Sequence, residues 1–266
     1  MPTFASLLAH PKPLIGVLHL PPLPGAPRSG PGLRAILEGA VRDARILARG
    51  GAQAVIVENL GDAPFAELVE PHVTAMLAVV AQHVVAAVGT ELLVGVNALR
   101  NDGLSALGAA AASEAGFVRI NVLSGAMVTD QGVIQGRARE TLLYRNRVAP
   151  QMGIVADVMV KHASPLGMGM NLAQAAKDCF GRGGADVLVV SGSGTGAATS
   201  PADLEAVRLA VPAAPLWIGS GFSLATAEIL SPLCTGAIVG TALHQGGELD
   251  APLDLERVRA IRAALG

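Results

Sequence analysis

Eight short apolar runs alternate with eight longer amphipathic or alanine-rich segments along the chain. This alternation is typical of βα units around a parallel sheet, and eight units close a barrel. The predicted strands lie at 14–20, 54–60, 92–99, 117–123, 154–163, 186–191, 216–219 and 237–241. The predicted helices lie near 33–49, 71–88, 105–115, 137–149, 171–181, 201–211, 224–233 and 254–264. We therefore predict an α/β fold, a single (β/α)8 TIM barrel.

The length of 266 residues is close to the roughly 250 residues typical of one such barrel, so we expect one domain over residues 1–266. The glycines before several strands, such as Gly50-Gly51 and Gly183-Gly184, suit the left-handed ends of helices. A proline-rich loop at 20–32 is longer than an ordinary βα turn. We expect it near the barrel mouth, either as a structural wrap or as a lid.

Charge and cysteine content narrow the class of protein. The formal net charge is only −2 and no block of Lys or Arg is present, so we expect no nucleic-acid groove. Cys179 and Cys234 lie far apart, which argues against a disulfide and favours a reducing compartment. The first residues lack a signal-peptide pattern, and the apolar stretch 73–88 is interrupted by Gln82 and His83. We expect a cytoplasmic protein with no transmembrane segment.

Two predicted strands carry polar residues at alternate positions. Side chains of a strand point alternately to its two faces, and both faces of a parallel barrel strand should be apolar. In the strand 117–123 this places Arg119 and Asn121 inside the barrel, and in the strand 154–163 it places Asp157 and Lys161 inside.

Three further polar residues stand near strand ends, with Asn97 on the third strand, Glu58 on the second and His19 on the first. The carboxyl ends of barrel strands are where TIM barrels assemble active sites, so we expect these side chains to converge there. The alternative is a buried salt-bridge network that ties the strands together. We favour a site, because buried ion pairs contribute little net stability.

Glycine-rich segments follow the last three strands. In a barrel, the loops after strands seven and eight commonly hold phosphate through backbone N–H groups. The predicted phosphate-binding residues are Gly192, Gly194, Thr195, Gly196, Ser220, Gly221, Gly240 and Thr241.

Other chemistries find less support in the residue pattern. A divalent metal held by Glu58, Asp157 and a histidine is one option, but no HxH or HExxH spacing is present. No GxSxG elbow surrounds the serines, which disfavours serine-hydrolase chemistry. His162 follows the inward Lys161, so we expect it to contact the helix side.

The chain resembles the BtpA/SgcQ family over nearly its whole length. The segments that carry the resemblance are 15–28, 57–65, 95–102, 117–136, 156–163, 195–196, 219–222 and 238–243. The resemblance implies a TIM barrel of the ribulose-phosphate-binding kind. The family is named after a factor that affects photosystem I accumulation in cyanobacteria, and other members are bacterial proteins encoded beside sugar or nucleoside metabolism. His244 departs from the family, in which we expect a lysine shortly after the last strand.

These observations leave three functions open. The first is an enzyme with isomerase-like or lyase-like chemistry on a small phosphorylated sugar or nucleoside-derived metabolite. Glu58, Asp157 or His19 would move protons, and Lys161 and Arg119 would stabilise negative charge, while Asn97 and Asn121 would bind substrate. The second is a non-enzymatic biogenesis factor for a membrane complex such as photosystem I, and the third is a metabolite-binding protein. The sequence names no cofactor, and a homo-oligomer stays open.

Overall fold

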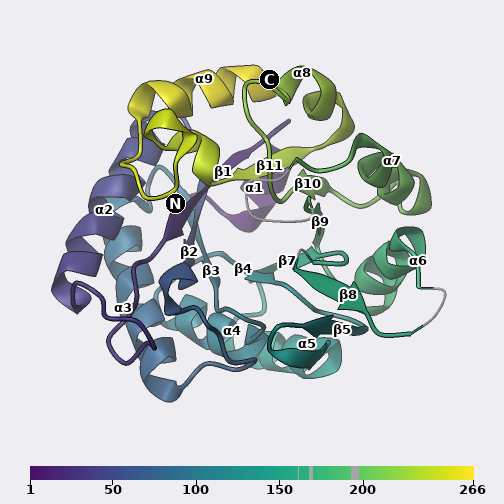
Figure 1. The fold of residues 1–266 in the computed structure, drawn as a ribbon, viewed down its shortest axis with the longest axis horizontal. Coiled ribbons are helices and arrows are strands. Elements are labelled where there is room, and N and C mark those ends of the chain that lie inside the picture. The colour runs from purple at the N-terminus through teal and green to yellow at the C-terminus, as the bar shows by residue number, and fades with distance from the viewer. Residues whose placement is uncertain (161, 168–169, 193–197) are drawn as a thin grey trace.

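The chain folds as a closed eight-stranded parallel barrel surrounded by helices. The computed structural model describes residues 1–160, 162–167, 170–192 and 198–266. The barrel strands are β1 (Leu14–His19), β2 (Ala54–Glu58), β3 (Leu93–Asn97), β4 (Phe117–Ile120), β7 (Gly153–Asp157), β9 (Val187–Val190), β10 (Leu216–Ile218) and β11 (Gly236–Val239). The first strand pairs with both β2 and β11, which closes the sheet (Figure 1). The predicted TIM barrel is confirmed.

Eight helices form the outer ring. They are α2 (Leu33–Arg49), α3 (Pro71–Val88), α4 (Gly103–Ala112), α5 (Ala138–Val148), α6 (Leu172–Lys177), α7 (Pro201–Ala210), α8 (Ala227–Leu230) and α9 (Leu255–Leu265). The first two match their predicted bounds, whereas the predicted helix at 171–181 continues from α6 into a π-helical turn, Asp178–Arg182.

Helix α3 is long and apolar enough to cross a membrane by length and composition. In the barrel it buries one face, including Leu77 and Val84.

The alternation predicted for the barrel strands separates two apolar regions. Residues such as Val118 and Ile154 belong to the core between the sheet and the helices. Residues such as Phe117, Val155 and Trp217 form a separate inner cluster. The apolar inner cluster fills the lower part of the barrel, so charged side chains can occupy only the layer above it, toward the mouth.

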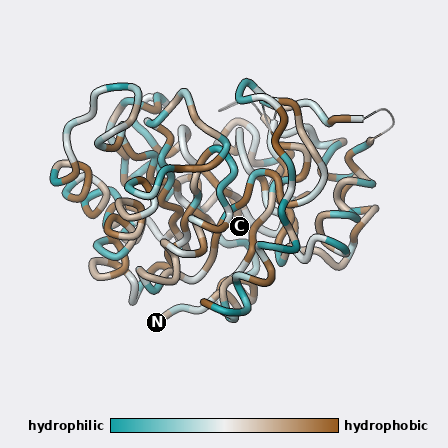
Figure 2. The backbone as a smooth tube through the Cα atoms, turned by 90° about the horizontal axis from the view of Figure 1, so that it is seen from below, coloured by the Kyte–Doolittle hydropathy of each residue, from teal (hydrophilic) through white to brown (hydrophobic). Residues whose placement is uncertain are grey.

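A short N-terminal helix, α1 (Phe4–Ala9), closes the floor of the barrel, and the sequence did not predict it. Thr3 and Ser6 form a capping box that stabilises its start. Leu7 is buried in the inner cluster, and the Phe4 ring lies 6.0 Å from that of Phe117. Figure 2 shows the N-terminal segment at one end of the molecule. This end of the barrel is therefore apolar, and the charged side chains lie toward the opposite end.

A small antiparallel sheet follows the ends of β4 and β7 along the chain. The strand predicted at 154–163 ends at Asp157, and the chain enters left-handed backbone at Met159 and His162. The last residue of the predicted strand, Ala163, begins β8 (Ala163–Pro165), which pairs with β5 (Ala126–Thr129). Strand β5 also pairs with β6 (Gly132–Gln135). The sheet forms because Met127 and Ile134 bury their side chains on Val122 and Val160.

Short polar side chains connect the mouth loops. Asp62 accepts a hydrogen bond from the Leu23 amide at 2.8 Å, which anchors the proline-rich loop to the segment after β2. Asn59 accepts from the Leu99 amide at 2.8 Å. Asn101 accepts from the Val122 amide at 2.7 Å and donates to its carbonyl at 3.0 Å. The loops after β1, β2, β3 and β4 are thereby connected in sequence around the rim.

Candidate functional site

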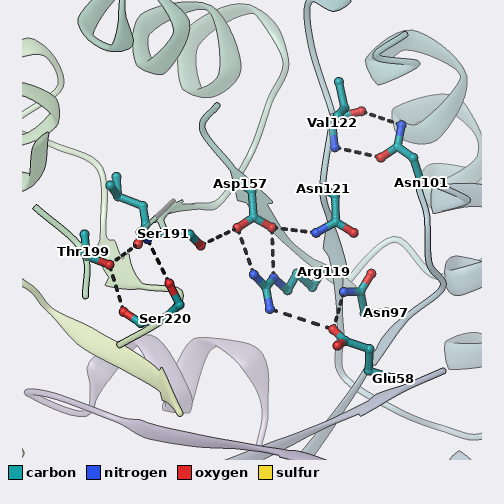
Figure 3. A network of polar contacts seen from close by, with 12 residues as sticks. Glu58, Asn97, Asn101, Arg119, Asn121, Val122, Asp157, Ser191, Thr199 and Ser220 are labelled. Carbon is teal, nitrogen blue, oxygen red and sulfur yellow. Dashed lines mark hydrogen bonds and ion pairs between the residues drawn. The ribbon is translucent and has the colours of Figure 1, made fainter. Parts of the chain in front are cut away.

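A charged cluster lies above the apolar layer, and Arg119 is at its centre (Figure 3). Arg119, on β4, donates through Nε and Nη2 to the two carboxylate oxygens of Asp157, each at 2.9 Å. Asn121 and Ser191 also donate to this carboxylate, at 3.1 and 3.3 Å. The Asp157 side chain is 0% exposed, so it is a fully satisfied buried anion.

Glu58 lies on the other side of Arg119. Its Oε2 accepts from Asn97 at 2.7 Å and lies 3.9 Å from Arg119 Nη1. Its Oε1 lies 3.7 Å from His19 Nε2, a separation too long for a direct hydrogen bond. The register pairs His19 with Glu58 and Glu58 with Asn97, so neighbouring strands end in the three polar side chains.

Electrostatics keep Arg119 charged inside the barrel. Burial alone would lower the pKa of Arg119, but Asp157 and Glu58 outweigh burial and hold that pKa above its ordinary value. Burial lowers the pKa of Arg100, an effect that Asp157, Asp130 and Glu58 partly offset. Arg119 is therefore a fixed positive charge between Asp157 and Glu58.

Two glycines permit this close packing. A Cβ on Gly219 would lie 2.3 Å from Ser191 Oγ and 3.5 Å from Arg119 Nη2. A Cβ on Gly240 would lie 2.5 Å from His19 Cε1. Larger residues at either position would force these side chains to move.

Two cavities open onto the charged cluster, and both are lined by His19, Glu58 and Arg119. One has a volume of about 270 Å³ and extends to the loops after β10 and β11, where Ser220, Gly221, Gly240 and Thr241 line it. The other has a volume of about 320 Å³ and extends toward Arg100, Asp130 and His162. Asp157 lines neither of these two, because it lies behind Arg119; it lines a separate small cavity of about 40 Å³, together with Asn121 and Cys179.

The loops after β9 and β10 are held together by hydroxyl groups. Ser220 accepts from the Gly192 amide at 2.9 Å, so that amide is already engaged. Thr199, a buried residue that the sequence did not single out, donates to the carbonyls of Val190 and Ser220. The backbone amides of Gly221 and Phe222 donate no hydrogen bond to an acceptor among the described residues. The predicted contacts of Gly194, Thr195, Gly196 and Lys161 lie outside the described residues.

The metal option has no support from the geometry. No group of three His, Cys, Asp or Glu side chains is placed to hold a metal ion in the part of the chain that the structure describes. The guanidinium of Arg119 lies between Glu58 and Asp157, in the place that a bridging cation would need.

The prediction for His162 was wrong. Its backbone has φ 57° and the residue lines the second cavity, at the barrel mouth. Alternation gave the wrong face because the strand stops five residues earlier, at Asp157.

Two polar residues that follow the last barrel strand differ in whether they line the cavities. His244 does not line either cavity, and its Nδ1 contacts the carbonyl of Ala251 at 2.5 Å. Arg257, in the first turn of α9, does line the first cavity, which the sequence analysis missed. No local motif marks it, because it enters the mouth from a helix that follows the barrel's last strand.

Comparison with known proteins assigns the chain to a family. The model of the BtpA family matches residues 10–265. The chain belongs to the BtpA family. It is 41% identical to the photosystem I biogenesis protein BtpA of Synechocystis, over 100% of this chain and 91% of that protein. An uncharacterized protein of Thermococcus kodakarensis is also 41% identical, over 94% of both chains. The resemblance seen in the sequence is confirmed.

Solved structures share the barrel of this BtpA-family chain at low sequence identity. A thiamine phosphate pyrophosphorylase from Pyrococcus furiosus has a TM-score of 0.61 at 16% identity, covering 97% of each chain. A phosphoribosyl anthranilate isomerase from Thermus thermophilus has a TM-score of 0.58 at 13% identity, covering 95% of this chain and 98% of that one. At such identity the likeness establishes the TIM-barrel fold alone.

Proposed function

We propose that this BtpA-family protein is an enzyme that binds a small phosphorylated metabolite and transfers a proton on it. The observation that carries the proposal is the placement of Glu58 and His19 on the walls of both cavities, beside a permanently charged Arg119. A carboxylate or imidazole beside a fixed cation can remove a proton while the cation stabilises the resulting negative charge.

The roles follow from which groups reach the cavities. Glu58 and His19 are the candidate proton-transfer groups, and Arg119 is the candidate electrostatic stabiliser. Asp157 is a positioning residue, because its carboxylate contacts Arg119 and does not line the two cavities that Glu58 and His19 line. The phosphate would bind at Gly221 and Phe222, whose amides are unengaged by described residues.

The names of two fold neighbours are consistent with this assignment. Thiamine phosphate pyrophosphorylase and phosphoribosyl anthranilate isomerase are both named for phosphorylated compounds. Their barrels cover nearly the whole chain, so the carboxyl-end loops have the same general location. This likeness favours a phosphorylated ligand but does not select one reaction.

The test combines binding and proton exchange. Phosphorylated sugars are screened by calorimetry, and binders are then followed by NMR in D2O for loss of C–H signals. We expect Glu58→Gln to slow exchange by about 100-fold or more, the usual contribution of a general base. Glu38→Gln, an exposed change on α2, serves as the control. Binding without exchange in the wild type would refute catalysis and favour a metabolite-binding protein.

A second candidate function rests on the full-length relative in Synechocystis, which is named for photosystem I biogenesis. The chain would be expressed in a Synechocystis strain that lacks BtpA, as wild type and as Glu58→Gln. Restoration of photosystem I by both forms would favour a biogenesis role that does not use the cavity chemistry. Restoration by the wild type alone would connect the two functions through Glu58.

A further inference from the structure

The first cavity contains a cation that the charged cluster does not use. Arg257 lines the cavity together with Ser220, Gly221 and Thr241. Asp254 caps α9 by accepting from the Arg257 amide at 3.3 Å, which fixes the backbone at this position. Arg257 Nε donates to the Ala242 carbonyl at 2.9 Å, which orients the guanidinium beside the loop after β11.

The charge of Arg257 is not neutralised by a protein carboxylate. Within residues 1–160, 162–167, 170–192 and 198–266, no Asp or Glu forms an ion pair with it. Its neighbour Glu256 pairs instead with Arg259, at 2.7 Å. In contrast, Arg119 in the same cavity is held by Asp157 and Glu58. The positive charge of Arg257 is therefore available to bind an anionic ligand in the first cavity.

The surroundings of Arg257 suit a tetrahedral anion. Gly221 and Phe222 also line this cavity, and their amides lack acceptors among the described residues. Backbone amides bind many oxyanions alike, whereas a guanidinium adds paired, charge-assisted hydrogen bonds. The attraction to a guanidinium also grows with the charge of the anion.

We infer that Arg257 is the side-chain ligand of the phosphate and selects a dianionic phosphate monoester over singly charged anions. The inference rests on the proposed phosphate-binding function and adds a residue and a ligand charge to it. It also implies that the phosphate end of the ligand occupies the first cavity. The uncharged part of the ligand then extends across Glu58 toward the second cavity.

Calorimetric titration with methyl phosphate and methyl sulfate tests this inference. The two probes have nearly the same shape, but near pH 7.5 methyl phosphate carries almost two negative charges and methyl sulfate one. We expect the wild type to prefer methyl phosphate. Arg257→Gln should bind methyl phosphate about 10- to 100-fold more weakly, the usual loss for a charged hydrogen bond. The same variant should lose most of the preference over methyl sulfate.

The control is Arg259→Gln, which removes the same charge from the same helix at an exposed position paired with Glu256. It should keep wild-type affinity and preference, and urea midpoints of both variants verify folding. If Arg257→Gln keeps both affinity and preference while the wild type binds, the role of Arg257 is refuted and the phosphate site stands. If the wild type binds neither probe, the phosphate site itself is refuted.

Discussion

Replacing Asp157 with Asn should be among the most damaging single changes in the barrel. The carboxylate accepts two hydrogen bonds from Arg119 and one each from Asn121 and Ser191, with no exposed surface. An amide presents one acceptor oxygen, and its NH2 group would face N–H donors. Among the residues that the structure describes, Arg119 would keep only Glu58, at 3.9 Å, as its counter-ion. Breaking such a buried pair costs about 3–5 kcal/mol.

Urea unfolding of a double-mutant cycle measures this cost. Asp157→Asn and Arg119→Met should each lower the free energy of unfolding by about 3–5 kcal/mol, because each breaks the buried Arg119–Asp157 pair and leaves the other member behind. The double variant removes both charges and should lose less than the sum, with a coupling on the order of 2–3 kcal/mol.

Asp186→Asn provides the matched control. Asp186 accepts from the Ile154 amide and pairs with Arg145, but its side chain is 38% exposed. The loss there should be about 1 kcal/mol or less. If Asp157→Asn is no more destabilising than Asp186→Asn, or if the cycle is additive, the buried pair does not stabilise the site as we argue.

Three further outcomes are expected. Leu7→Ala should lower the free energy of unfolding by about 2–5 kcal/mol, because Leu7 fills the barrel floor, whereas the exposed Leu8→Ala should change it by about 0.5 kcal/mol or less in the same urea titration. Gly240→Ala should weaken phosphate binding measured by calorimetry, since its Cβ would displace His19; unchanged binding would contradict that contact. Burial raises the pKa of Cys179 to about 12, so native protein should resist iodoacetamide at pH 8.5. Because this pKa exceeds the unfolded value near 9, the stability contribution is complete below pH 9 and is lost as pH rises toward 12.

The barrel could be predicted because its evidence is repetitive. In each βα unit a short apolar run, typical of a buried strand, is followed by a longer amphipathic segment, typical of a helix. Eight weak signals of the same kind therefore support one fold. The inward direction of Arg119 and Asp157 followed from alternation within strands that do form. The same reasoning failed at His162, because alternation holds only while the chain remains extended and β7 ends at Asp157.

Other features depend on contacts that no local pattern encodes. The hairpin of β5 and β6 carries alternating side chains in Met127-Val128 and Val133-Ile134, yet each strand has only four residues. Its apolar face forms only because Val122 and Val160 lie beneath it. Likewise, Arg257 reaches the cavity from a helix far along the chain, and Thr199 is placed by the fold rather than by a motif.

The pairing of β1 with β11 has a consequence for biosynthesis. Leu14, Ile15 and Gly16 meet Ala237, Ile238 and Val239, so the first strand stays unpaired on one edge until the last strand has been made. A nascent chain therefore carries an open sheet edge through most of its translation, and contacts so distant in sequence slow folding. Truncation before β11 should yield an aggregation-prone product rather than a smaller stable domain.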